Sequence, residues 1–199
     1  MTDFRTELRI GDRIQAARKQ RGIKSARDLA DLIPGGNVTE AILQNIEAGR
    51  KEDLSISQWL NIAFALKISP SLLLVPIGLP TNTIGLPGLS PDLAALTVLE
   101  FDSWLANSQN GVYTWTTEEQ RNERSQLQAM RELEVQLQER ARLRTALDVE
   151  RGQDLTAAEV EELQRWDTTE ERLDHAERQV NQLSAYLRSS GWSLDGWIG

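Results

Sequence analysis

Positions 10–75 hold a series of short segments with helical apolar spacing, each of which ends at a residue that breaks a helix. In the first segment Ile10, Ile14 and Ala17 fall on one helical face, and Gly22 follows as a stop. Four further helices are predicted to begin near Ser25, Thr39, Ser55 and Ser69, which are residue types common at helix starts. The sequence therefore predicts five short helices over residues 10–75 and an all-α fold.

The third of these helices has the most complete set of start and stop signals. Thr39 is a good N-cap, and Val38 before it is correctly spaced to contact Leu43 as a hydrophobic staple. Gly49 is expected to end the helix just after Ala48. Pro34-Gly35-Gly36 separates this helix from the preceding one. The pattern predicts a helix, a glycine-rich turn and a second helix in immediate succession.

A linker with one helix is expected between residues 76 and 115. Residues 76–90 include three prolines and three glycines among scattered apolar residues, a composition typical of a linker. Ser90-Pro91 repeats the helix-start signature, and the leucine spacing that follows extends the predicted helix to about Asn107. The sequence leaves open whether this helix packs on the preceding or the following part of the chain.

From residue 116 the composition shifts to Glu, Arg, Gln and Leu, which is typical of long helices. One helix is predicted from about Thr117 to Glu150. A second is predicted from about Ala157 to Ser189, where Thr156 and Glu159 form a capping box. The second helix has heptad-like apolar spacing. A short turn between two long helices predicts an antiparallel helical hairpin, a coiled coil, over residues 116–199.

This hairpin has two interpretations. Its seam is either a scaffold closed within one chain or a surface that joins two subunits. The apolar stripe of the second helix is richer than that of the first, which favours surplus surface and hence dimerisation through residues 116–190. The residues predicted to form that contact are Trp166, Leu173, Val180, Leu183 and Leu187.

Charge and composition exclude several classes of function. The net charge of −8 divides unevenly, because residues 1–75 carry 11 basic and 9 acidic residues (+2), whereas residues 76–199 carry 11 and 21 (−10). The absence of cysteine excludes disulfides and thiolate metal sites and fits a reducing cytoplasm. No run of apolar residues long enough for a membrane span, no secretory signal and no nucleotide-loop, HExxH or GxSxG motif is present. We therefore expect no enzyme activity, no metal or cofactor, and no membrane association.

Several local patterns of the first 75 residues occur together in a known family. They are Gly11 to Ile14, Arg18, Gly22-Ile23, Leu29-Ala30, Val38-Thr39, the run ILQNIEAGR (Ile42 to Arg50), Ile62-Ala63, Leu66 and Leu73. In order and spacing these residues resemble the Cro/C1 (XRE-type) helix-turn-helix regulators, and are similar to actinobacterial and actinophage members. Two features depart from the family: the spacing from Ala30 to Glu47 is a few residues longer, and Ser25-Ala26-Arg27 replaces the usual glutamine.

The resemblance implies that the third helix enters the major groove of DNA. The base-reading positions that it implies are Thr39, Glu40, Ala41, Gln44 and Asn45. Gln44 and Asn45 have side chains that pair with adenine, and Glu40 can accept from cytosine. Phosphate contacts are expected near helix ends, from Ser25, Arg27, Asn37, Arg50 and Lys51. In the family an acid at the position of Glu47 pairs with an arginine at the position of Arg18.

The predicted function is a sequence-specific DNA-binding transcriptional regulator, a repressor that serves as a phage immunity protein or a host regulator and acts as a dimer on a palindromic operator. The alternative is an antitoxin-like or adaptor module, in which the acidic hairpin binds a protein partner. For individual residues a plainer interpretation also stands, because Gln44, Asn45, Arg50 and Lys51 are types that commonly lie on solvated surfaces.

Overall fold

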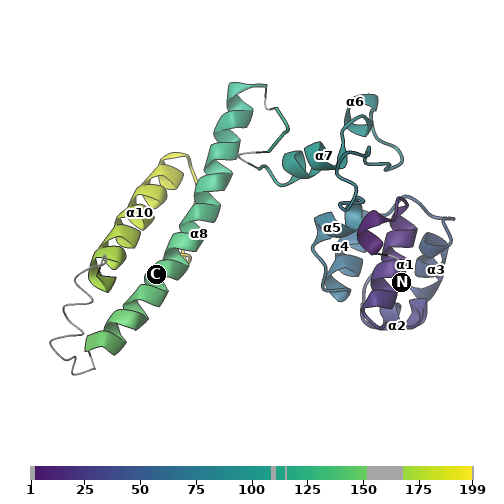
Figure 1. Cartoon of the computed structure of the whole chain (residues 1–199), viewed down its shortest axis with the longest axis horizontal. Coiled ribbons are helices and arrows are strands. Elements are labelled where there is room, and N and C mark those ends of the chain that lie inside the picture. Colours follow the sequence, from purple (N-terminus) through teal and green to yellow (C-terminus); the bar gives the residue numbers. More distant parts are fainter. Residues whose placement is uncertain (1–2, 109–110, 115, 152–167, 199) are drawn as a thin grey trace. The chain divides into compact units, whose positions relative to one another are not determined.

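The computed structural model describes residues 3–108, 111–114, 116–151 and 168–198 (Figure 1). The chain divides into two compact units, Met1–Thr114 and Trp115–Gly199. Within the described residues there is no β-strand, and the β-type pairing there is an isolated bridge between Thr83 and Thr97. The all-α class is thus confirmed for this part of the chain. None of the helices described has the length and apolar character required to cross a membrane.

The first unit begins with six helical elements. They are η1 (Phe4–Thr6), α1 (Ile10–Gln20), α2 (Ala26–Asp31), α3 (Glu40–Glu47), α4 (Ile56–Ala65) and α5 (Pro70–Leu74). Ser25, Thr39 and Ser55 each accept a hydrogen bond from the third amide of the helix that they precede, as helix caps do. Five α-helices therefore lie between residues 10 and 75, where the apolar spacing predicts five.

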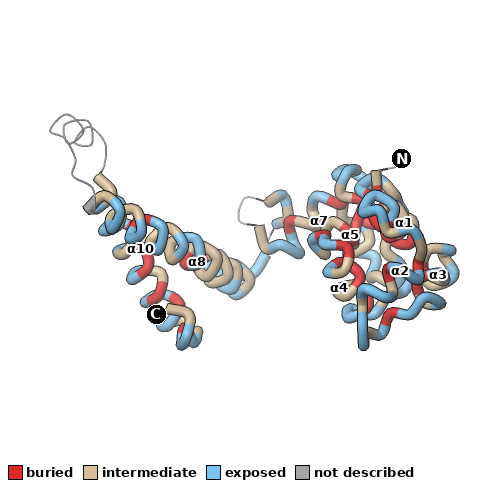
Figure 2. The backbone as a smooth tube through the Cα atoms, turned by 90° about the horizontal axis from the view of Figure 1, so that it is seen from below, coloured by how far each residue is buried: buried red, intermediate tan, exposed pale blue. Residues whose placement is uncertain are grey.

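One hydrophobic core holds these helices together (Figure 2). Each helix contributes fully buried side chains to it, including Ile14, Leu29, Leu43, Ile46, Ile62 and Leu73. Gly11 lies where α1 and α3 approach closely, because a Cβ atom at Gly11 would stand 2.1 Å from the carbonyl oxygen of Ile46. Burial of this apolar surface is the main stabilising force of the unit.

A charged residue is also buried in this unit. The Arg13 guanidinium donates hydrogen bonds to four backbone carbonyl oxygens, those of Glu7, Leu8, Leu73 and Leu74, over 2.6–2.9 Å. Burial lowers the pKa of Arg13 to about 10, which leaves the group charged at neutral pH. Arg13 therefore joins the residues just before α1 to the end of α5.

Residues 76–114 belong to the first unit and are not a simple linker. Val75, Ile84, Val98 and Phe101 form a second small hydrophobic core. Backbone hydrogen bonds from Val98 to the carbonyl of Asn82 (2.8 Å) and from Leu99 to that of Pro80 (3.0 Å) hold the segment folded. The proline- and glycine-rich segment 76–90 thus makes tight turns around a core, which its linker-like composition alone does not indicate.

The single helix predicted over residues 91–107 is two helices, α6 (Pro91–Ala94) and α7 (Val98–Leu105). Thr97 separates them, because its hydroxyl accepts from the amide of Glu100 while the Glu100 carboxylate accepts from the amide of Thr97. This capping box starts a new helix where the leucine spacing alone predicts continuity.

The second unit contains two long helices, α8 (Glu118–Arg151) and α10 (Thr169–Ser189). They lie side by side and run in opposite directions, because Gln126 of α8 bonds to Trp192 after α10, while Glu150 near the end of α8 bonds to Thr169. The core between them includes Leu133, Val180 and Leu187. The predicted start of the second helix at Ala157 lies outside the described residues.

Candidate nucleic-acid interface

Helix α3 exposes one face and buries the other. Leu43 and Ile46 are fully buried in the core of the first unit, whereas Glu40, Ala41 and Gln44 are exposed. Helix α3 lies against α1 and α2, so its orientation is set by two neighbours. Thr39 is exposed and Asn45 half-buried, so four of the five predicted base-reading positions lie on the open side.

The turn between α2 and α3 is ordered by hydrogen bonds of its own. Gly35 has a positive φ of 68°, which glycine adopts without steric cost, and the amide of Gly36 donates to the carbonyl of Ile33 at 3.1 Å. Val38 is buried in the same core as Leu43, as the predicted hydrophobic staple requires. These contacts fix the conformation of the α2–α3 turn and therefore the position at which α3 begins.

Asn37, predicted as a phosphate contact, has structural bonds to α4. Its side-chain nitrogen donates to Ser57 Oγ at 2.5 Å, and its backbone carbonyl accepts from Gln58 Nε2 at 3.1 Å. Asn61 Nδ2 donates to its side-chain oxygen at 3.4 Å. The Asn37 side chain is exposed but already has two partners, so its main effect is to hold the α2–α3 turn against α4.

The polar side chains on α3 are held in place by their neighbours. Gln44 Nε2 donates to Glu40 Oε1 at 3.0 Å, and Arg50 Nε donates to Asn45 Oδ1 at 2.9 Å. The side-chain oxygen of Gln44 and the side-chain nitrogen of Asn45 keep hydrogen-bonding capacity for a further partner. Ala41 is exposed on the same helix, and its small side chain lets another molecule approach the helix closely.

Cationic side chains flank α2 and α3. Arg27 is exposed in the first turn of α2, where Ser25 Oγ accepts from the amide of Asp28 at 3.1 Å. Arg50 is exposed and Lys51 half-buried in the loop just after α3. These three cations have the charge that phosphate contacts require, and the Ser25 hydroxyl proton is available as a donor.

The C-terminal turn of α3 is fixed to α1 by a buried ion pair. Arg18 Nε and Nη2 each lie 2.8 Å from a different carboxylate oxygen of Glu47, which confirms the predicted pairing. Arg18 Nη1 also donates to the carbonyl of Ile23 at 2.9 Å. The hydrogen bond with Glu47 raises the pKa of Arg18 above its ordinary value. Bidentate geometry of this kind restricts both distance and orientation.

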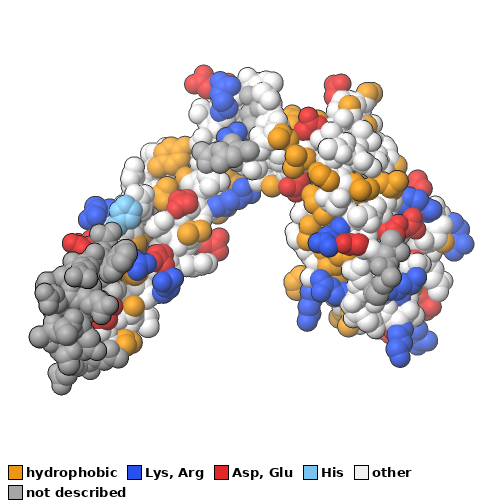
Figure 3. All heavy atoms as spheres, in the orientation of Figure 1, with side chains coloured by type: hydrophobic (Ala, Val, Ile, Leu, Met, Phe, Trp, Pro, Cys, Tyr) orange, Lys and Arg blue, Asp and Glu red, His pale blue; other side chains and the backbone are white. Residues whose placement is uncertain are grey.

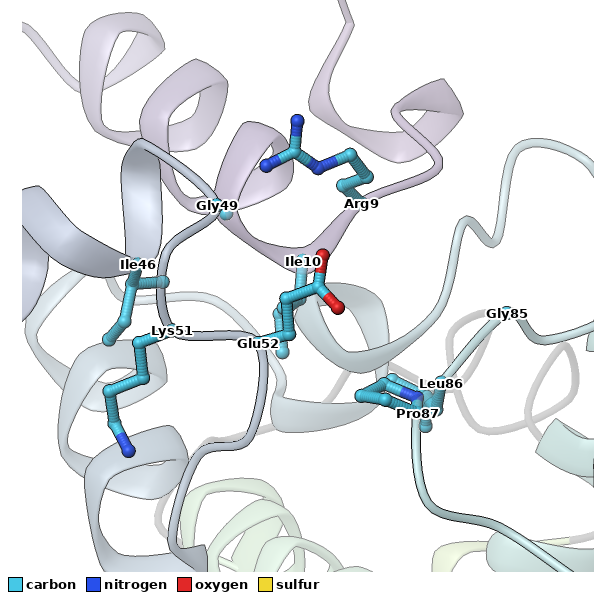
Figure 4. Close-up of a pocket in the computed structure, with 10 residues that line it drawn as sticks. Arg9, Ile10, Ile46, Gly49, Lys51, Glu52, Gly85, Leu86 and Pro87 are labelled. Atoms are coloured by element: carbon cyan, nitrogen blue, oxygen red, sulfur yellow. The ribbon is translucent and has the colours of Figure 1, made fainter.

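A cavity of about 320 Å³ lies beside the end of α3 (Figure 4). Ile10, Ile46 and Leu86 contribute apolar lining, and the Glu52 carboxylate borders it. The Arg9 guanidinium covers Gly49. Of the predicted DNA-contact residues, Lys51 alone lines this cavity. The cavity is therefore separate from the exposed face of α3.

The residues predicted for dimerisation are largely used within the chain. Val180 and Leu187 are buried against α8, and Leu183 packs on the same core. Leu173 is half-buried, and Trp166 lies outside the described residues. The seam predicted to join two subunits is thus filled by α8 of the same chain. Dimerisation through residues 116–190 stays a prediction.

No protein-family model, curated protein or solved structure matches this chain. Function is therefore inferred from the residues of the chain itself. Sequence reasoning placed the exposed face of α3 and the Arg18–Glu47 pair, but it missed the bonds from Asn37 to α4 and the buried role of Arg13.

Proposed function

We propose that residues 1–75 form a helix-turn-helix DNA-binding domain of the Cro/C1 type, and that the protein is a transcriptional regulator, a repressor that binds a palindromic operator as a dimer. The observation that carries this proposal is the exposed face of Glu40, Ala41 and Gln44 on a short helix whose opposite side is fully buried. A helix exposed in this way fits the major groove, and its polar side chains then meet base edges.

In this proposal α3 and the cations that flank it have different roles. Gln44 and Asn45 hydrogen-bond base edges, with Gln44 steadied by Glu40 and Asn45 by Arg50. Arg27, Arg50 and Lys51 bind phosphates, and these contacts set the register of the helix on the duplex. Repression then follows from occupancy of promoter DNA and needs no chemical step.

Changing Gln44 to alanine tests the base contact. DNA selected from random duplexes by the full-length protein is used as the probe. A bidentate contact to a base contributes about 1–3 kcal/mol, so Gln44→Ala is expected to weaken binding by roughly 5- to 150-fold and to relax the preference at one base pair. Binding is measured by fluorescence anisotropy. Gln138→Ala, at an exposed glutamine of α8, serves as the control and is expected to bind like the wild type.

If Gln44→Ala selects the same bases with the same affinity, the assignment of α3 as the reading helix is wrong. If the wild type selects no sequence at all, the regulator proposal fails. The acidic interaction module is then the better description.

The double variant Arg50→Ala/Lys51→Ala tests the phosphate contacts. Because each neutralised phosphate contributes about 0.9 to the slope of log affinity against log salt concentration, the slope is expected to fall by about two. Affinity should drop for specific and non-specific duplexes alike, apart from any loss caused by releasing Asn45 from Arg50. A salt series measures the slope, and Arg188→Ala in α10 is the matched control. An unchanged slope contradicts the assignment.

A further inference from the structure

Helix α4 carries an exposed apolar ridge, formed by side chains that do not pack in the core of the first unit. Ile56, Leu60 and Phe64 recur every fourth residue along it and are 73%, 43% and 87% exposed. The core-facing side of α4 is already satisfied, because Ile62 and Ala63 are fully buried. Hydrophobic side chains gather on the side of the first unit formed by α4, α5 and α7 (Figure 3). Contiguous exposed apolar side chains of this kind mark a contact surface.

The charges around the ridge restrict what can cover it. Helix α4 contains no charged residue, so the ridge offers no cation to a phosphate backbone. Asp53 precedes the helix and Lys67 follows it, and both are exposed. Among the described residues neither side chain takes part in an ion pair. The surface is therefore apolar in the middle, acidic before its first residue and basic after its last.

We infer that the ridge binds the same ridge of a second copy of this chain, with the two α4 helices antiparallel about a twofold axis at Leu60. In that register Ile56 meets the partner's Phe64, and Asp53 lies near the partner's Lys67. Both pairs are equally spaced about Leu60 along the sequence, so each contact occurs twice by symmetry. A parallel arrangement would instead place Asp53 beside Asp53 and Lys67 beside Lys67.

The size of the ridge indicates when this contact forms. A stable interface buries about 800 Å² per partner, and three side chains of one helix fall well short of that. The contact is therefore weak in dilute solution and becomes effective when two copies are held close together, as on adjacent half-sites of DNA. The inference deepens the proposed function, and rests on it for this role, but its test requires no DNA.

The chain contains no cysteine, so single cysteines report on the contact directly. Full-length Leu60→Cys is oxidised at tens of micromolar, and the disulfide-linked dimer is followed by non-reducing gel electrophoresis. Leu8→Cys and Leu32→Cys are the controls, because these residues are 58% and 54% exposed, more than Leu60 at 43%. Random collision would link the controls at least as fast. The inference predicts that Leu60→Cys links several-fold faster than either.

Register is tested by mixing two variants. An equimolar mixture of Ile56→Cys and Phe64→Cys is expected to form mostly mixed dimers, whereas a parallel pairing would give mostly dimers of each with itself. In the Leu60→Cys background, Asp53→Lys should slow cross-linking, and adding Lys67→Asp should restore it.

Equal cross-linking rates for Leu60→Cys and both controls would overturn the inference. A slower rate for Leu60→Cys would also overturn it, because it would mean that another part of the same chain covers the ridge. Circular dichroism melting verifies that each variant is folded. Cross-linking is measured without DNA, so the two tests are independent. A negative cross-linking result does not contradict the DNA-binding proposal, and a negative DNA-binding result does not affect the cross-linking rates.

Discussion

Replacing Arg13 with methionine is expected to lower the free energy of unfolding of the first unit by about 3–5 kcal/mol, because several carbonyl oxygens lose their donor at once. Methionine fills much of the same volume but donates no hydrogen bond. The carbonyls of Glu7, Leu8, Leu73 and Leu74 would then remain wholly or partly buried without the guanidinium. Urea denaturation followed by circular dichroism measures the change.

Arg27→Met is the matched control, since Arg27 is an exposed arginine of α2. It should change stability by no more than about 0.5 kcal/mol, as surface substitutions usually do. A loss below about 1 kcal/mol for Arg13→Met would mean that water replaces the guanidinium at these carbonyls at little cost. The expected contribution of Arg13 to the stability of the first unit would then be wrong.

The second large effect is expected at Glu47. Glu47→Ala leaves the Arg18 guanidinium buried without its carboxylate, which costs about 3–5 kcal/mol when a buried pair is broken from one side. The C-terminal turn of α3 also loses its attachment to α1. We therefore expect lower stability together with weaker DNA binding, measured by urea denaturation and by anisotropy on the same protein.

Two variants separate charge from geometry at this pair. Glu47→Gln keeps a hydrogen-bond acceptor without the charge. Its free energy of unfolding should therefore lie between those of wild type and Glu47→Ala. Glu40→Ala removes an exposed carboxylate from the same helix and should leave stability nearly unchanged. Equal stability of Glu47→Ala and wild type would contradict the structural importance of the pair.

Local sequence signals predict the helices of the first unit well. A cap such as Thr39 acts within one turn, and the Val38–Leu43 staple spans few residues, so both are readable without knowing the fold. The break between α6 and α7 was readable in the same way, because Thr97 and Glu100 have capping-box spacing. Leucine spacing alone predicts one continuous helix there, because it carries no information about the cap.

Contacts between distant residues account for the rest. In the sequence Arg13 looks like an ordinary surface arginine, because its partners Leu73 and Leu74 are about sixty residues away and are brought to it only by the fold. Residues 76–90 read as a linker because the core that they help to form pairs Ile84 with Val98 and Phe101. The bonds of Asn37 to α4 are hidden from local sequence patterns for the same reason, since its partners there are twenty residues or more away in sequence.

The bonds of Arg13 also link the two ends of the five-helix stretch within the first unit. The guanidinium bonds to Glu7 and Leu8 at one end and to Leu73 and Leu74 at the other, and the amide of Gly78 donates to the carbonyl of Arg5 at 2.8 Å. The start and the finish of this stretch of chain are thus joined to each other. Fraying at either end removes the hydrogen-bond partners of the other. We therefore expect the two ends to open together rather than to fray independently.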